Sequence, residues 1–208
     1  MTQRRRLLVF EGSDGAGKST QIALLAGKLA AQGRACVQLR EPGGTDVGED
    51  IRKVLKYSKS NPSPHTELLL MNASRAQLVD TVILPALEQG KDVLLDRFFY
   101  STIAYQGFGR QLPLHTVQNV IQAAVGSLQP EHVFLLRIPL KVSIERRLAR
   151  QGCLAFADID RFEKEEAAFF QRVEEGYSHI AAADPQHVHV IDATQSVQDV
   201  HDEICHYL

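Results

Sequence analysis

The amino-acid sequence predicts a three-layer α/β fold in which a five-stranded parallel sheet is flanked by helices. Short apolar runs alternate with amphipathic patterns, as expected of strands that are joined by helices. Glycine, proline and polar residues separate these segments. The chain has 208 residues, of which 44% are hydrophobic, enough to bury one sizeable core. Strands connected by helices pair in parallel through right-handed crossovers, so both faces of the sheet are expected to be covered.

Five apolar runs are the expected strands: residues 7–10, 35–39, 93–95, 133–138 and 188–191. The residues between them carry apolar side chains at helical spacing, which predicts helices over 22–29, 47–55, 65–88, 101–105, 114–125, 142–150, 162–180 and 197–207. We expect Pro85 to kink or end the long helix over 65–88, because proline lacks the amide hydrogen that a helix interior uses. No repeat or long linker divides the sequence, so we expect residues 1–208 to form one domain.

Composition narrows the possible partners. The sequence holds 23 Lys and Arg against 25 Asp and Glu, a formal net charge of −2, so no basic field indicates nucleic-acid binding. No apolar run approaches the ~18 residues of a membrane-spanning helix. The cysteines Cys36, Cys153 and Cys205 are scattered, without a C-x-x-C pair, which favours a reducing compartment. We therefore expect a cytoplasmic protein without nucleic-acid or membrane partners.

The strongest chemical signal is a phosphate-binding loop between the first strand and the helix that follows it. The segment GSDGAGKS at residues 12–19 fits the pattern G-x-x-x-x-G-K-[ST] in that context. Backbone amides of such a loop converge on phosphate, and the helix N-terminus adds partial positive charge. Lys18 would neutralise the β- and γ-phosphates of ATP, and the Ser19 hydroxyl would ligate Mg²⁺. The residues predicted to bind the ATP phosphates are Gly12, Ser13, Asp14, Gly15, Ala16, Gly17, Lys18, Ser19 and Thr20.

Asp96 is the second candidate at the phosphate site. It ends an apolar strand, and parallel sheets present their ligand-binding groups at the carboxyl edge. We expect Asp96 to hold Mg²⁺ together with Ser19, directly or through water.

A phosphate-binding loop does not define the reaction. A GTPase needs an N-K-x-D guanine-binding motif, and Asn61, Asn72 and Asn119 are not followed by lysine. Motor proteins and helicases have longer chains or basic tracts. Transporter subunits and kinases of small molecules remain.

Several further motifs carry a family resemblance. They are residues 10–20 (FEGSDGAGKST), 40–45 (REPGGT), 96–98 (DRF) with Ser101, 104–107 (AYQG), 160–163 (DRFE) and 191–195 (IDATQ). In this order, and over nearly the whole chain, they resemble the thymidylate kinase family, of the bacterial type with a lid arginine. The resemblance implies a P-loop nucleoside monophosphate kinase fold and transfer of the γ-phosphoryl group of ATP to dTMP, for dTTP supply.

The resemblance also implies a dTMP site. Arg97, assisted by Arg40, would hold the acceptor phosphate, because a guanidinium grips phosphate with two hydrogen bonds. Arg75 would hydrogen-bond thymine, and Tyr105 would pack against the deoxyribose. The implied dTMP-binding residues are Asp14, Arg40, Arg52, Met71, Arg75, Arg97, Thr102, Tyr105 and Gln106.

Three of these residues have a simpler interpretation as well. Arg52 and Arg75 could be solvated helix residues, and Tyr105 could belong to the core. Met71 departs from the family pattern, in which phenylalanine one helical turn before the base-binding arginine stacks on thymine. Methionine packs on a ring through its sulfur but lacks an aromatic face.

The lid is expected at about residues 147–161. Gly15 stands where some family members have a P-loop arginine, so the cation for the transferred phosphoryl group is expected from the lid. Arg147 or Arg150 is the favoured candidate, with Arg161 as a third. The alternative is a solvated basic helix end that complements its own dipole. The predicted catalytic residues are thus Asp14, Lys18, Arg97, Arg147 and Arg150.

The remaining points concern the adenine side, the assembly, the rival functions and the C-terminal helix. Ala193, Thr194 and Gln195 would lie on the adenine side, and a homodimer would form through helices such as the one over 65–88, both by resemblance. A deoxynucleoside kinase, in which Glu41 acts as base on a hydroxyl acceptor, and a regulatory protein with a degenerate site are the rival hypotheses. His201, Cys205 and His206 superficially resemble a metal site, but a C-terminal helix end is the favoured interpretation.

Overall fold

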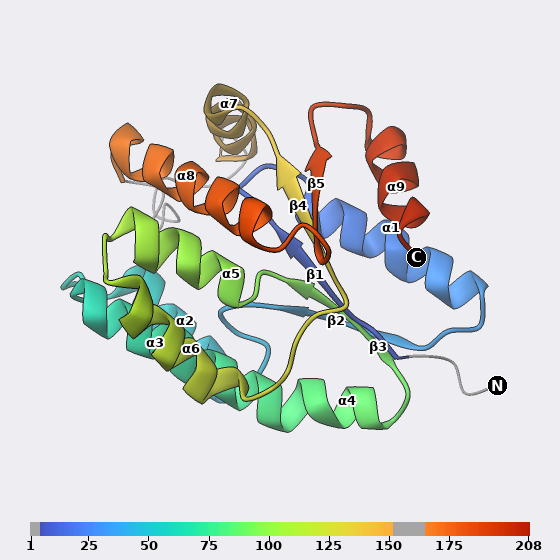
Figure 1. The fold of residues 1–208 in the computed structure, drawn as a ribbon, viewed down its shortest axis with the longest axis horizontal. Helices are drawn as coiled ribbons and strands as arrows, with labels where there is room; N and C mark the ends of the chain where they lie inside the picture. Colours follow the sequence, from blue (N-terminus) through green and yellow to red (C-terminus); the bar gives the residue numbers. More distant parts are fainter. Residues whose placement is uncertain (1–4, 152–164) are drawn as a thin grey trace.

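The computed structural model describes residues 5–151 and 165–208, without the side chains of residues 147, 148, 150 and 151. Its sheet has five parallel strands in the order β2-β3-β1-β4-β5, which confirms the predicted fold class (Figure 1). The strands are β1 Leu7–Glu11, β2 Cys36–Arg40, β3 Asp92–Asp96, β4 His132–Arg137 and β5 Val188–Asp192.

Helices cover both faces of the sheet. They are α1 Lys18–Ala31, α2 Asp46–Tyr57, α3 Pro64–Leu78, η1 Val79–Ile83, α4 Leu84–Glu88, α5 Phe99–Thr102, η2 Ile103–Gly109, α6 Leu114–Val125, α7 Leu140–Gln151, α8 Ala167–Ala183 and α9 Val197–His206. The part of α8 that was expected at residues 162–164 lies outside the described residues.

Alternation along β1 shows how the two faces are formed. Leu7 and Val9 join a core that includes residues of α3, α6 and α8, whereas Leu8 and Phe10 join a core with α1 and α9. All four are buried, as expected of a central parallel strand. Figure 1 shows the two helical layers on opposite sides of the sheet.

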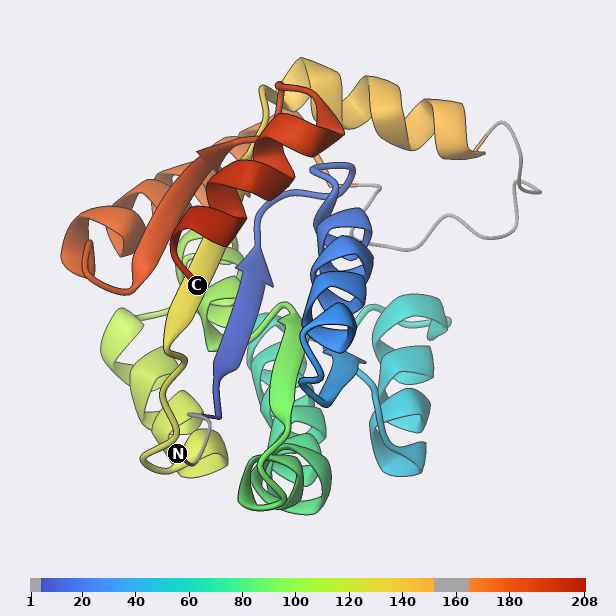
Figure 2. The ribbon, with the colours of Figure 1, turned by 90° about the vertical axis from the view of Figure 1, so that its right-hand side faces the viewer.

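The strand register brings the candidate residues to one edge. Phe10 pairs with Asp96, and Arg40 pairs with the same aspartate from the other side. Because the strands are parallel, the loops that follow β1, β2 and β3 therefore leave the sheet together. Figure 2 shows α7 above these carboxyl ends.

The helix over 65–88 does not end at Pro85. The departure from α geometry lies just before it, where Val79–Ile83 form a π-helical segment, and α4 continues to Glu88. Proline cannot donate the hydrogen bond of a regular turn, and the wider π turn is where the hydrogen-bonding pattern changes. The helix expected at 101–105 is also longer, since α5 and η2 together span 99–109.

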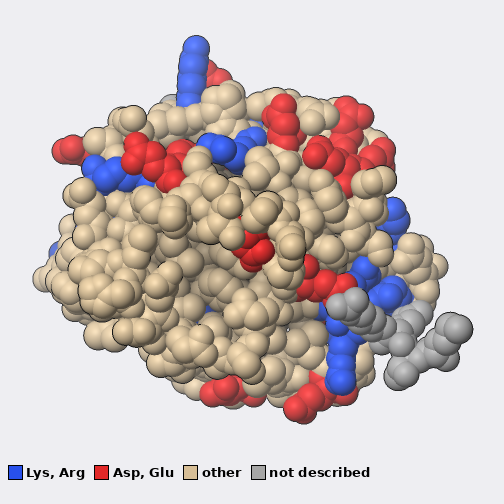
Figure 3. All heavy atoms as spheres, viewed as in Figure 1, with Lys and Arg blue, Asp and Glu red and all other residues tan. Residues whose placement is uncertain are grey.

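The surface and the C-terminal helix agree with an ordinary globular composition. Acidic and basic side chains are interspersed on the face drawn in Figure 3. Among the described helices, none combines the length and hydropathy that crossing a bilayer requires. His201 packs on α1, with Nδ1 3.2 Å from Gln21 Oε1, and its Nε2 lies 3.5 Å from Cys205 Sγ.

Candidate active site

A cavity of about 630 Å³ lies at the carboxyl edge of the sheet, a volume typical of small-ligand sites. It is lined by the phosphate-binding loop, the loop after β2, α3 and the α5–η2 segment. The predicted site residues among its lining are Asp14, Gly15, Gly17, Lys18, Ser19, Thr20, Arg40, Arg52, Met71, Arg75, Asp96, Arg97, Thr102, Tyr105 and Gln106.

Two glycines set the path of the phosphate-binding loop. Gly12 has φ 124°, and a Cβ there would collide with the Leu136 carbonyl oxygen of β4. Gly17 has φ 94° and caps α1, which begins at Lys18. Side chains other than glycine would be strained at both positions. Gly12, Ser13 and Ala16 do not belong to the cavity lining.

Lys18 is held by the loop that it follows. Its Nζ donates hydrogen bonds of 3.0 Å to the carbonyl oxygens of Gly12 and Ser13, and lies 4.0 Å from Asp14 Oδ1. Burial, and then the positive charge of Arg97, lower the pKa of Lys18. The ammonium group therefore lies against the loop backbone. Its hydrogen-bond partners are carbonyl oxygens, which a bound phosphate can replace.

Ser19 and Asp96 meet at the same edge of the cavity. The Ser19 hydroxyl donates to Asp96 Oδ2 over 3.0 Å. Hydroxyl and carboxylate oxygens are the donor types that Mg²⁺ prefers. The two residues predicted to hold the metal are therefore adjacent and chemically suited to it.

Arg97 lies beside Asp14. Its Nη2 is 2.8 Å from Asp14 Oδ1, and its Nη1 donates to the hydroxyls of Ser101 at 3.0 Å and Tyr177 at 3.2 Å. The backbone of Arg97 has φ 70°, a left-handed conformation that costs on the order of 1–2 kcal/mol for a residue with a Cβ.

Glu11 stabilises this strained turn, and sequence analysis missed it. Its buried carboxylate accepts hydrogen bonds from the amides of Phe98 at 2.8 Å and Ser101 at 3.1 Å. It also accepts from the hydroxyls of Ser101 at 2.6 Å and Tyr177 at 3.0 Å. An acid that ends a buried strand was the available signal, but its partners lie about 90 and 166 residues away in sequence.

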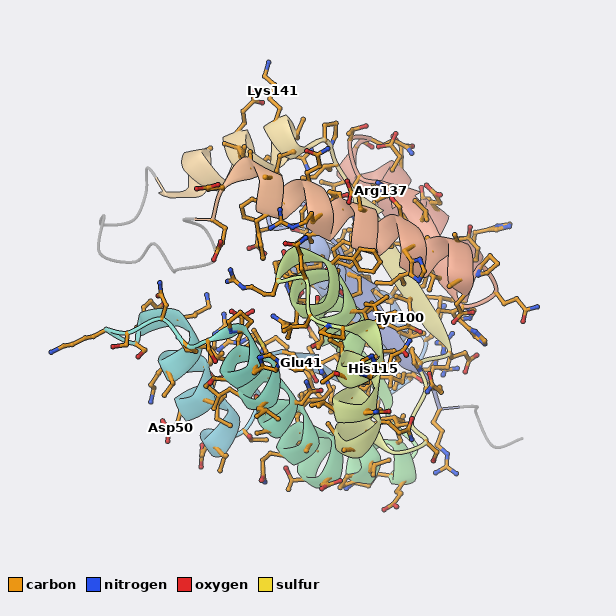
Figure 4. The ribbon with its side chains drawn as sticks, turned by 60° about the vertical axis from the view of Figure 1, so that its left-hand side comes forward. Glu41, Asp50, Tyr100, His115, Arg137 and Lys141 are labelled. Atoms are coloured by element: carbon orange, nitrogen blue, oxygen red, sulfur yellow. The ribbon has the colours of Figure 1, made fainter. Side chains whose placement is uncertain are left out.

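Arg75 is not a solvated helix residue, because only 2% of it is exposed. Its Nε and Nη2 lie 2.9 and 2.8 Å from Glu41 Oε2, and its Nη1 donates to Asn72 Oδ1 over 2.7 Å. Burial raises the pKa of Glu41 to about 7, against the opposing effect of Arg75. Figure 4 labels Glu41, which lies beside α3.

The two other arginines predicted to bind dTMP, Arg40 and Arg52, hold the loop after β2. Arg40 Nη2 lies 3.1 Å from Glu49 Oε1 at the surface, and Arg52 Nη1 donates to the Pro42 carbonyl over 2.8 Å. Thr45 caps α2 by accepting from the Gly48 amide. Arg40 and Arg52 therefore line the cavity while their charges are already engaged.

The α5–η2 segment supplies the remaining predicted residues. Thr102 and Gln106 are 1% exposed, and the Arg97 guanidinium lies 5.3 Å from the centre of the Tyr105 ring. Burial raises the pKa of Tyr105 to about 12. Met71 is half-buried in the cavity wall, one helical turn before Arg75.

Helix α7 packs against the phosphate-binding loop. The Ser143 hydroxyl donates to the Asp14 carbonyl over 2.7 Å, and Arg146 Nη1 lies 3.2 Å from the Gly15 carbonyl and 3.3 Å from that of Ala193. Arg146 lines the cavity, although sequence analysis placed the lid cation at Arg147 or Arg150. The side chains of those two residues, and all of Arg161, lie outside the described part of the chain.

The predicted adenine-side loop follows β5. The amide and hydroxyl of Thr194 donate to Asp192 Oδ1 over 2.9 and 2.7 Å. Ala193 reaches Arg146, but Ala193, Thr194 and Gln195 do not line the described cavity.

The phosphate-binding loop and an arginine-lined second site meet at the Asp14 carboxylate, which lies near both Lys18 and Arg97. This arrangement defines a P-loop nucleoside monophosphate kinase. The comparisons with known proteins identify the family. The thymidylate kinase family model matches residues 10–204, and the chain therefore belongs to the thymidylate kinase family.

Individual relatives agree with this assignment. A thymidylate kinase of Chlorobium luteolum is 46% identical over 198 residues, covering 94% of this chain and 92% of its own. One from Kosmotoga olearia is 43% identical, covering 94% and 91%. The crystal structure of thymidylate kinase from Ehrlichia chaffeensis superposes with a TM-score of 0.76 at 29% identity, covering 97% of both chains.

Proposed function

We propose that this chain transfers the γ-phosphoryl group of ATP to the phosphate of dTMP and releases dTDP and ADP. The observation that carries the proposal is the position of Asp14. Arg97 lies 2.8 Å from one of its carboxylate oxygens and Lys18 lies 4.0 Å from the same oxygen. Arg97, which we expect to hold the acceptor phosphate, thus lies next to Lys18, which we expect to bind the donor phosphates.

The reaction requires these residues to neutralise the charge of the phosphates and to align the two nucleotides. A phosphate monoester is largely dianionic at pH 7, so its oxygen can attack the γ-phosphorus without a general base. The bond from the γ-phosphorus to the β–γ bridging oxygen breaks, and its electron pair leaves with ADP. Lys18 would stabilise charge on the donor phosphates, and Arg97 would hold the acceptor oxygen in line.

Mg²⁺ is part of the proposal. Ser19 and Asp96 would hold it, since their oxygens lie 3.0 Å apart at the cavity edge. Bound Mg²⁺ neutralises charge on the β- and γ-phosphates. Chelation by EDTA is expected to abolish turnover and added Mg²⁺ to restore it.

We propose that one of Arg147, Arg150 and Arg161 contacts the transferred phosphoryl group. The support is Gly15, whose lack of a side chain leaves the phosphate-binding loop without an arginine of its own. Such a cation is worth roughly three to five orders of magnitude in turnover. Alanine at each position tests this, and the proposal fails if none of the three variants loses even tenfold.

One coupled assay tests the proposed reaction. ADP release is measured with ATP and, in separate reactions, dTMP, thymidine, dUMP or UMP. We expect dTMP to be the best acceptor. Turnover of thymidine without turnover of dTMP would instead support a deoxynucleoside kinase, and ATP binding without turnover would support a regulatory protein.

The assembly and compartment are proposals as well. A cytoplasmic homodimer is supported by exposed apolar residues along α2 and α3, among them Val54 and Leu69, and by the free thiols of Cys36 and Cys205. Sedimentation of the purified protein tests the dimer, and cell fractionation tests the compartment.

A further inference from the structure

The amide of Gln106 has a fixed partner on the side away from the cavity. Gln106 lies on η2 and lines the cavity, although it is almost fully buried. Its Nε2 donates to Glu67 Oε1 over 2.6 Å, a short, charge-assisted hydrogen bond. Glu67 lies in the first turn of α3 and is fully buried.

Glu67 is itself held in place by Arg110. The Arg110 Nε lies 3.3 and 3.2 Å from the two carboxylate oxygens of Glu67, and its Nη2 lies 3.1 Å from Oε2. Arg110 in turn lies 4.6 Å from the centre of the Phe169 ring and forms an ion pair of 2.6 Å with Glu165 of the segment before α8. The carboxylate of Glu67 is therefore restrained from both sides.

This arrangement decides which end of the Gln106 amide faces the cavity. A carboxylate only accepts hydrogen bonds, so the amide nitrogen must be the atom that contacts Glu67. The reversed amide would place its oxygen against a carboxylate oxygen at 2.6 Å, which is repulsive. The amide carbonyl is thus left to face the cavity, and Gln106 presents an acceptor to a bound base.

The neighbouring cavity wall presents the opposite group. Arg75 can only donate hydrogen bonds, and it lines the same cavity. A donor and an acceptor in one cavity match the edge of thymine or uracil, where the O4 carbonyl stands next to the N3–H group. Cytosine has the reverse pattern, an amino group beside an unprotonated ring nitrogen.

We propose that Glu67, restrained by Arg110, is a positioning residue that fixes the Gln106 amide and thereby selects a base with a ring N–H donor over cytosine. The inference rests on the proposed function and specifies how the same site chooses among pyrimidine nucleotides. Glu67 acts through Gln106, on base selection and not on phosphoryl transfer.

The test is the variant Glu67→Gln, because a neutral amide at residue 67 can either donate or accept and so lets the Gln106 amide flip. The ratio of kcat/KM for dTMP to that for dCMP is expected to fall about tenfold, as for one misdirected hydrogen bond. The dTMP-to-dUMP ratio should stay constant, since both bases share the same edge. We expect KM for dTMP to rise while kcat changes less than about threefold.

A double-mutant cycle separates positioning from a structural effect. In the background Gln106→Met, which has no amide to orient, Glu67→Gln should change the dTMP-to-dCMP ratio less than twofold. An equal change in both backgrounds, or an unchanged ratio in the wild-type background, would overturn the proposal. If Glu67→Gln does not fold, as judged by thermal melting, Arg110→Lys decides in the same cycle, because a lysine loses the two-point grip on Glu67.

The wild-type assay keeps the two proposals apart. Wild-type protein without activity on dTMP contradicts the proposed function. Wild-type activity on dTMP with a Glu67→Gln selectivity equal to that of wild type contradicts only this inference.

Discussion

Two parts of the cavity differ in how their charged side chains are paired. They are the phosphate half, around Lys18 and Arg97, and the base half, around Arg75 and Gln106. In the phosphate half, Lys18 is held by backbone carbonyls, and Arg97 pairs with Asp14, whose side chain is 42% exposed. In the base half, Arg75 and Glu41 form an ion pair in which the side chains are only 3% and 5% exposed. The cations of the phosphate half are thus held by backbone oxygens and by a solvent-exposed acid, whereas the cation of the base half is paired with a buried acid.

The difference fits the ligand that we propose for each half. A polyanion can replace backbone oxygens as the partner of an ammonium group and gain a charge-assisted hydrogen bond. A pyrimidine base is uncharged, so an unpaired buried cation beside it would only carry a desolvation cost. The base half therefore offers paired charges as a rigid set of donors and acceptors, and it selects by fit.

The largest expected effect comes from breaking the phosphate half at Lys18. Lys18→Ala should lower kcat by about a thousandfold, because a preorganised cation at the transferred phosphate is lost. KM for dTMP should change little. Steady-state kinetics measure both, with Lys53→Ala as the matched control, since Lys53 forms an exposed i,i+3 ion pair on α2. A loss of less than tenfold in kcat would contradict the assigned role.

Arg97 is the next test of the same half. Arg97→Ala should lower kcat/KM for dTMP by about a hundredfold, and Arg97→Lys should recover part of it, because lysine keeps the charge but not the two-point grip. ATP binding should persist. Arg137→Ala is the matched control, an arginine 40% exposed that pairs with Glu174 at 3.5 Å. Wild-type activity of Arg97→Lys would show that the two-point geometry of Arg97 is unimportant.

Breaking the base half should affect binding more than turnover. Arg75→Met is expected to raise KM for dTMP by about twentyfold, through a lost hydrogen bond to the base and a Glu41 left without its partner. The double variant Arg75→Met with Glu41→Gln removes the second effect and should melt at a higher temperature than the single variant. If kcat falls as much as kcat/KM, Arg75 acts on the transition state and the division between the halves is wrong.

The smallest effect on activity is expected for Glu41→Gln, with KM for dTMP changing less than about threefold. Its signature is pH dependence. Burial raises the pKa of Glu41 to about 7 from its ordinary value of 4.5. Between these values the folded protein binds more protons than the unfolded chain, so the free energy of unfolding falls as pH rises through this window.

Denaturant unfolding from pH 5 to pH 8 measures this contribution. Relative to Glu41→Gln, the wild-type protein should lose on the order of 3 kcal/mol of unfolding free energy across the window, because burial raises the pKa of Glu41 to about 7. A pH-independent difference between the two proteins would show that Glu41 does not titrate there.

The contrast between the halves also explains which site residues the sequence could predict. The phosphate-binding loop is contiguous, and its glycines and the start of α1 encode its geometry locally, so Lys18 and Ser19 could be placed from their spacing. Asp96 could be placed because the end of a parallel strand has a known position in the sheet. Arg75 and Gln106 required the family resemblance, since neither lies in a local pattern with a physical meaning of its own.

The partners of these residues could not be predicted from the sequence. Glu11, Glu67, Arg110, Tyr177 and Arg146 act through contacts with residues far away in the sequence, and no spacing rule connects them. Pro85 gives the same lesson for the fold, because the π-helical segment before it accommodates a residue that by itself predicts a break.

The sequence alone therefore determined the alternation of strands and helices, the phosphate-binding loop and the acid at the end of β3, because hydrophobic periodicity and local backbone geometry act over a few residues. Only the tertiary structure decided which acid neutralises which buried arginine and which end of the Gln106 amide faces the cavity. Those choices depend on how α3, η2 and α8 pack together, since a buried charge must pair with whatever group the neighbouring element brings within hydrogen-bond distance.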